Sequence, residues 1–153
     1  HPHYLKQYNK RWFAFGLNQD KEKSHWNVAL DRIEEIKETD GKYISSEKDW
    51  EDYFYDIVGV TVPSGLNKPE NVLLKFSKEQ APYVITKPLH LSQKPPKYND
   101  DGTVEIRIKV IPNNELERLI LSYGSGIEVL EPIELRERIV KTIKQTADTY
   151  LCK

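Results

Sequence analysis

Two short segments in the first quarter of the chain constrain its fold more than any other feature. Lys10–Gly16 alternates aromatic and small residues after two cations, and Val28–Ile33 carries an Asp-Arg dipeptide inside an apolar run. Both patterns are typical of short β-strands. A guanidinium between Leu30 and Ile33 must find a partner or line a pocket, because an unpaired buried charge is costly. The segments therefore predict a small β-module with Arg32 inside it or at its mouth, and binding rather than catalysis.

The composition excludes several classes of protein. At 153 residues the chain is long enough for one domain or two small ones, and 38% hydrophobic residues allow only a modest core. A net charge of −1 excludes a uniformly basic coat for nucleic acid, although His1–Gln19 holds cations and no acid. No apolar run approaches the roughly 18 residues that span a bilayer, so no membrane partner is expected. The single cysteine, Cys152, fits a reducing, cytoplasmic compartment.

The first 60 residues are predicted to form a small barrel with a trailing helix. Trp12 is expected in its core, because so large a side chain would dominate the packing. Ser45 and Ser46 are candidate N-caps for the helix, which we expect at about 47–57. Aromatic and β-branched runs separated by turn residues predict four short strands: 4–8, 11–17, 25–30 and 33–38.

The second half alternates strands and helices. The strand at 103–111 alternates most cleanly, with four β-branched side chains inward and charged ones outward. Asn113 or Asn114 is expected to cap the helix that follows. The resulting order, β-α-β-β-α-β and a terminal helix, is the ferredoxin-like split βαβ arrangement. Strands are predicted at 71–76, 89–94, 103–111 and 127–130, and helices at 77–87, 114–123 and 133–150.

Several motifs resemble those of WYL-domain proteins. The triplet Trp12-Phe13-Ala14 after Arg11 resembles the Trp-Tyr-Leu signature, and Leu30-Asp31-Arg32-Ile33 resembles a second signature of that family. Asn113-Glu115-Leu116, together with 127–132, resembles the WCX extension that often follows a WYL domain. Residues 87–93 resemble a form found in Bacteroidetes members. The resemblance covers nearly the whole chain.

The resemblance implies an α+β chain with two domains. Residues 1–60 would be an Sm-like, SH3-type β-barrel whose expected first strand is not visible in the sequence. Residues 61–70 would be a linker, and 71–153 a ferredoxin-like WCX domain with a C-terminal helix. WYL proteins are commonly bacterial transcription regulators, so the chain is expected to be a fragment of a longer polypeptide that senses a ligand. It would dimerise and reach DNA through a helix-turn-helix upstream of His1.

The candidate ligand is a nucleotide or a single-stranded nucleic acid. Arginine offers a rigid fork for phosphate, and aromatic rings beside cations can stack bases. On a strand, Tyr4, Lys6 and Tyr8 share one face. The alternative interpretation is that the tyrosines pack within the barrel and that Arg32 forms a structural ion pair with Asp31 or Glu34. The predicted ligand-binding residues are His3, Tyr4, Lys6, Tyr8, Arg11 and Arg32.

Catalysis and metal binding are not expected. The four histidines, His1, His3, His25 and His90, have no metal-site spacing, and no nucleophile or phosphate-loop motif is present. No cofactor and no enzymatic activity are predicted. The alternative function is a structural dimerisation module without a small ligand, because the apolar faces at 104–110 and 116–120 make a packed domain by themselves.

Overall fold

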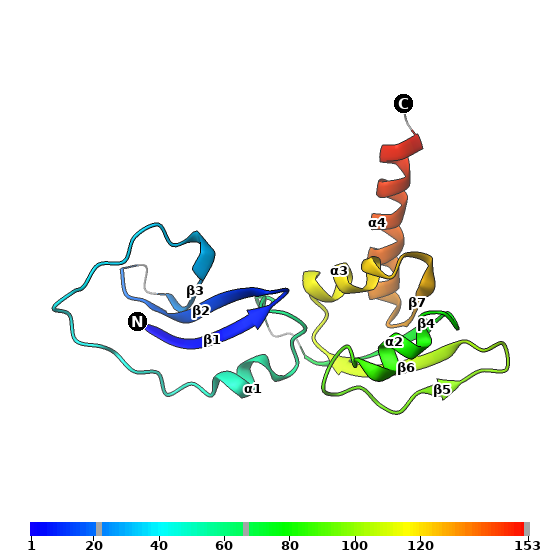
Figure 1. Cartoon of the computed structure of the whole chain (residues 1–153), viewed down its shortest axis with the longest axis horizontal. Helices are drawn as coiled ribbons and strands as arrows, with labels where there is room; N and C mark the ends of the chain where they lie inside the picture. Colours follow the sequence, from blue (N-terminus) through cyan, green and yellow to red (C-terminus); the bar gives the residue numbers. More distant parts are fainter. Residues whose placement is uncertain (21–22, 66–67, 152–153) are drawn as a thin grey trace. The chain divides into compact units, whose positions relative to one another are not determined.

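A computed structural model of the chain describes residues 1–20, 23–65 and 68–151. The chain divides into two compact units, unit 1 (His1–Tyr55) and unit 2 (Asp56–Lys153), both shown in Figure 1. This division lies ahead of residues 61–70, because Val58 already belongs to the hydrophobic core of unit 2. None of the helices in the described ranges has the length and apolar character needed to cross a membrane.

Unit 1 is built on an antiparallel sheet of three strands, β1 (Pro2–Tyr8), β2 (Arg11–Asn18) and β3 (Lys23–Ala29), in that order. The β1–β2 turn is made by Asn9 and Lys10, which both have positive φ, as a two-residue hairpin turn requires. These strands confirm the first three strand predictions.

The fourth predicted strand of unit 1, at 33–38, is wrong. After β3 the chain forms a short 3₁₀ turn, η1 (Leu30–Arg32), and then an extended segment without strand pairing. Ile36 is 83% exposed, so the apolar positions in this run face no core that would hold them in a sheet. Within the described residues the sheet of unit 1 stays open and does not close into the expected barrel.

The helix of unit 1, α1 (Trp50–Tyr55), is shorter than predicted and has a different cap. The Oδ1 atom of Asp49 accepts hydrogen bonds from the backbone N–H groups of Glu51 and Asp52, each at 3.0 Å. Asp49 therefore takes the N-cap role that we expected of Ser45 or Ser46. Trp50 and Phe54 are the buried residues of the helix, as the apolar spacing predicted.

Unit 2 has the predicted element order, strand-helix-strand-strand-helix-strand and a terminal helix. Its four strands form one antiparallel sheet of order β5-β6-β4-β7. In this order β6 lies between β4 and β5, which follow one another in the sequence, as the split βαβ arrangement requires. The elements are β4 (Glu70–Phe76), α2 (Ala81–Thr86), β5 (Lys97–Tyr98), β6 (Val104–Val110), α3 (Asn114–Ser122), η2 (Gly124–Gly126), β7 (Ile127–Glu131) and α4 (Ile133–Leu151).

The predicted strand at 89–94 is a turn instead, and the short strand β5 lies in the predicted loop. The hydroxyl of Ser92 bonds the backbone of Lys109 on β6, donating to its carbonyl at 2.9 Å and accepting from its N–H at 2.8 Å. The Nδ1 atom of His90 lies 2.8 Å from the same hydroxyl. A side chain thus occupies β6 backbone groups that a strand at 89–94 would have used.

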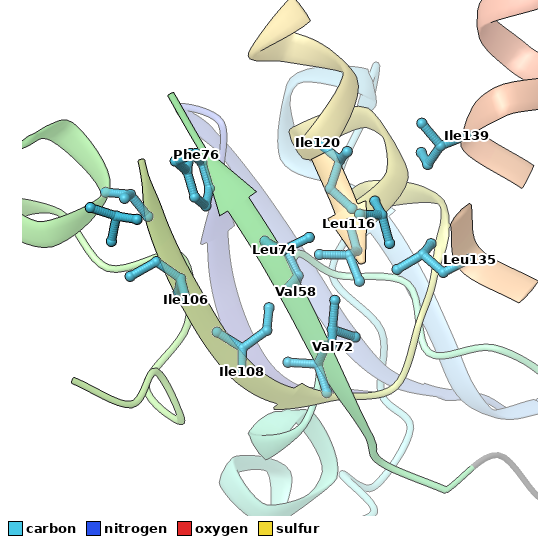
Figure 2. Packing of buried hydrophobic residues seen from close by; sticks show 14 of the residues in the cluster. Val58, Val72, Leu74, Phe76, Ile106, Ile108, Leu116, Ile120, Leu135 and Ile139 are labelled. Carbon is cyan, nitrogen blue, oxygen red and sulfur yellow. The ribbon is translucent and has the colours of Figure 1, made fainter. Parts of the chain in front are cut away.

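The core of unit 2 lies between one face of its sheet and the helices (Figure 2). The inward alternation predicted for β6 is confirmed, because its four β-branched residues are almost completely buried. Strands β4 and β7, Val58 and the helices α2, α3 and α4 contribute the rest, and α4 is buried only near its start, at Leu135 and Ile139. The largest fully buried side chains are Phe76, Leu74, Ile106, Ile108, Leu116, Ile120, Leu135, Val72, Val84, Val104 and Val110.

Candidate functional site

The sheet of unit 1 has one face that packs against α1. In the β1–β2 register Tyr4 is paired with Phe15, and Lys6 with Phe13. Directly paired residues share a face, so these side chains lie on the same side of the sheet. Phe15 meets α1 there, with its ring centre 4.8 Å from that of Phe54. We call this side, which carries Tyr4, Lys6 and Phe15, the α1 face.

Tyr4 stacks on the helix rather than offering its ring to a base. Its ring lies nearly parallel to Trp50, at 7° and 6.0 Å between centres, and 5.8 Å from Phe54. For Tyr4 this is the packing alternative that the sequence left open. Tyr8 lies at the other end of the same face, paired with Arg11, and is half-buried.

Two lysines, Lys6 on the α1 face of the sheet and Lys48 just before α1, lie over aromatic rings of α1. The ammonium of Lys6 lies 4.4 Å from the centre of Phe54, and that of Lys48 lies 3.5 Å from the centre of Tyr53. Burial lowers the pKa of both lysines below the ordinary value of 10.5, because each charge has lost part of its water. In the described ranges neither ammonium has a carboxylate at ion-pair distance. Rings partly stabilise such cations, and an anion would stabilise them further.

The two arginines of the predicted site differ in their surroundings. Arg11 is paired with Asp31, with 3.0 Å between Nη2 and Oδ2. Arg32 ends η1 and is exposed, and it forms no ion pair with any residue that the structure describes. Of the two positions expected for this guanidinium, inside the β-module or at its mouth, the first is wrong, because Arg32 and its neighbours Leu30 and Ile33 are exposed. Arg32 is therefore a solvent-exposed cation without an ion-pair partner in the part of the chain that the structure describes.

His3 is held by its own chain. Its Nε2 atom lies 2.8 Å from the carbonyl oxygen of Ile44, and its ring meets Tyr43 edge-on at 5.8 Å. Tyr43 in turn donates a hydrogen bond from its hydroxyl to the carbonyl of Pro2. These contacts fasten residues 43–44 to β1. The side chain of His25 lies outside the described residues, and elsewhere no group of three potential metal ligands is found.

Trp12 is 47% exposed, so the expectation that it belongs to the core is wrong. The register pairs it with Gln7, on the side of the sheet opposite the α1 face, where Leu5 is also exposed. The large core aromatic of unit 1 is instead Trp50. Its indole Nε1 is buried and has no hydrogen-bond partner among the described residues. An exposed indole is a stacking platform that the packed Tyr4 ring no longer provides.

Sequence reasoning missed Lys48 and Tyr53 as neighbours of the predicted site. The helix spacing identified Trp50 and Phe54 as one face, and that was the available signal. It did not show that this face would cover Tyr4 and Lys6, about 45 residues away in the chain. The structure brings His3, Tyr4 and Lys6 together around α1, and it places Arg11 and Arg32 with the β2–η1 pairing.

Unit 2 has the architecture of a small α+β domain in which helices cover one face of a four-stranded antiparallel sheet. The model of the WCX domain family matches residues 68–147, which is more than half of the chain. The chain therefore belongs to the WCX family, as its Asn113, Glu115 and 127–132 motifs indicated.

Distant likenesses to solved structures are also found, and one of them is to a protein of known name. Proteasome accessory factor B/C (PafBC) of Arthrobacter aurescens matches over 90% of this chain and 20% of its own, at 18% identity and a TM-score of 0.39. The chain thus spans about a fifth of the length of that protein. At this TM-score the likeness does not define the fold of either unit. No curated protein matches the chain.

Proposed function

We propose that this chain is the ligand-sensing part of a WYL-type transcriptional regulator, and that unit 1 binds a nucleotide or a single-stranded nucleic acid. Membership of the WCX family supports a role as part of a transcriptional regulator. The motifs around Trp12 and Arg32 support the assignment of unit 1 as a WYL domain. In this proposal the module binds and relays rather than catalyses. The complete protein would be cytoplasmic and dimeric, and would reach DNA through an upstream helix-turn-helix.

One observation carries the proposal: the partly desolvated ammonium groups of Lys6 and Lys48 flank the Tyr53–Phe54 ring pair without a carboxylate partner in the described chain. Desolvation of a cation is unfavourable, and a phosphate placed nearby would offset it. Arg32 adds an exposed guanidinium that can bind phosphate in bidentate fashion. Trp12 adds an exposed ring on the opposite side of the sheet from Lys6, which only a ligand long enough to cross the sheet would also contact. Acidic small molecules without a stacking ring would use the cations alone and should bind less tightly.

Arg32→Ala should weaken the binding of a labelled single-stranded oligonucleotide at least tenfold. The substitution removes a guanidinium that has no ion-pair partner in the described chain and can donate hydrogen bonds to phosphate. Fluorescence anisotropy at two salt concentrations measures this, with a cyclic dinucleotide as competitor. The apparent affinity of the unchanged chain should also fall with salt. Arg118→Ala, an exposed arginine on α3, is the matched control and should leave binding intact. Equal affinities for both variants would remove Arg32 from the site.

Lys6→Met should abolish most of the oligonucleotide binding without destabilising unit 1, because the substitution removes a desolvated charge and keeps a side chain of similar length. The pKa of Lys6 is lowered in the folded state, so between that value and 10.5 the unfolded state holds more protons. The stability of unit 1 should therefore rise with pH through this window, and less so in the variant. Urea titrations at pH 8 and 10.5 check the sign. Lys37→Met, an exposed lysine of the same unit, is the control.

Dimerisation without a ligand is the second candidate function, and the exposed apolar stripe of α4 favours it. Val140, Ile143, Tyr150 and Leu151 follow the buried start of the helix, and Ile143 is 52% exposed. A hollow of about 110 Å³ lies beside this stripe, lined in part by Ile120, Val140 and Ile143. A second copy of the chain would cover these residues.

Ile143→Asp should shift the chain from dimer to monomer in sedimentation velocity, because it puts a charge into the stripe. Thr149→Asp, exposed on the same helix, is the matched control. A chain that sediments as a monomer before any substitution would contradict this candidate.

A further inference from the structure

The segment that enters unit 2 is fastened to the first turn of α3 by one asparagine. The side-chain amide of Asn113 donates to the carbonyls of Val58 and Thr61, each at 2.9 Å. Its Oδ1 atom accepts the backbone N–H of Leu116 at 2.8 Å, which is the N-cap bond of α3. Asn113 is buried. It therefore uses both amide protons and its carbonyl oxygen to join residues more than fifty apart in sequence.

Glu115 holds the same segment a second time. Its Oε1 atom accepts a hydrogen bond from the Thr61 hydroxyl at 2.5 Å, while Oε2 is buried and has no partner among the described residues. Gly59 passes over this side chain with φ +85°, and a Cβ there would lie 2.7 Å from the Glu115 Cγ. Only glycine allows so close an approach in that conformation.

The fastened stretch is residues 56–61, and we call it the latched segment. Val58 packs into the core of unit 2, and the carbonyl of Asp56 accepts the N–H of Ile111 at 2.9 Å. Beyond these contacts the segment has no helix or strand of its own. Its attachment therefore depends on a few polar bonds and on the two adjacent buried side chains of Ile57 and Val58.

We propose that Asn113, Glu115 and Thr61 form a releasable latch that sets how much free chain connects the two units. When the latch is closed, the chain is fixed on unit 2 from Asp56 onward. When it opens, six residues are freed, and they reach roughly 20 Å at full extension. The unpartnered Oε2 of Glu115 disfavours the closed state, since a buried polar atom without a partner loses its hydration. This cost favours opening of the latch, and it does not depend on what unit 1 binds.

Asn113→Asp tests the bonds of the latch while keeping the N-cap bond of α3. Aspartate keeps the oxygen that caps α3, but it replaces the donor to Val58 and Thr61 with a second oxygen. Thermolysin should cut residues 56–61 of the full chain at least tenfold faster in this variant. The distance distribution between spin labels at Lys10 and Lys141, in a Cys152→Ser background, should broaden. Asn114→Asp, an exposed neighbour with the same charge change, should match the unchanged chain in both measurements.

Two milder variants keep the proposal falsifiable if Asn113→Asp disturbs the fold of unit 2. Thr61→Val removes only the hydroxyl bond to Glu115 and should speed cleavage about threefold. Glu115→Gln keeps that acceptor and removes a buried charge, so cleavage should slow and the distance distribution should narrow. Unchanged cleavage and unchanged distances in both variants would overturn the latch. Cleavage spread over the whole of unit 2, with loss of helical circular dichroism, would show a structural role only and would also overturn it.

Discussion

Gly59→Ala is expected to lower the free energy of unfolding of unit 2 by about 2–4 kcal/mol, through backbone strain and overpacking combined. The strain arises because Gly59 has φ +85°, and the overpacking because its new Cβ would lie 2.7 Å from the Glu115 Cγ. Both effects act where the latched segment crosses α3. Urea unfolding followed by circular dichroism near 222 nm measures the change, since unit 2 holds most of the helix.

Gly124→Ala isolates the first of these effects. Gly124 also has positive φ, at +57°, but no atom lies within 4 Å of the position that its Cβ would take. Its replacement should therefore cost only the strain, about 1 kcal/mol. Equal losses at the two glycines would show that the close approach to Glu115 has no energetic consequence.

Leu74→Ala should cost unit 2 about 2–5 kcal/mol, because the substitution leaves a cavity in a fully buried part of the core. Leu74 lies on β4, which is paired on both sides, with β6 and with β7. Little collapse is possible there, so we expect the upper part of the range. The same unfolding measurement applies.

Leu91→Ala is the matched control, with the same atoms removed at a position that is 87% exposed. Its effect should stay within about 0.5 kcal/mol. If Leu74→Ala were equally mild, the side chain would not belong to the core shown in Figure 2.

The fold of unit 2 was largely predictable because its strongest strand has a clear period. Seven residues from Val104 to Val110 alternate strictly, and a one-residue slip would bury Glu105 and Arg107. The failure at 89–94 has a local cause, since the Ser92 hydroxyl takes the backbone groups of β6. Hydrophobic periodicity cannot show that a side chain bonds the backbone of β6 in place of a neighbouring strand.

Unit 1 was less predictable because its aromatic residues could pack on either side of a strand. The register, which no local pattern reveals, put Tyr4 against α1 and left Trp12 exposed. The sequence predicted Lys6, Arg11 and Arg32 as ligand-binding cations of this unit, and it did not single out Lys48. It could not show that Asp31 would pair with Arg11 and not with Arg32, because the pairing depends on how β2 meets η1.

All three tryptophans of the chain, Trp12, Trp26 and Trp50, lie in unit 1. Intrinsic emission excited at 295 nm therefore reports on that unit alone, without any attached dye. Trp12 is half exposed and Trp50 is buried, so iodide should quench the first and spare the second. A stacked base would shield Trp12 from iodide, which gives ligand screening a built-in optical signal.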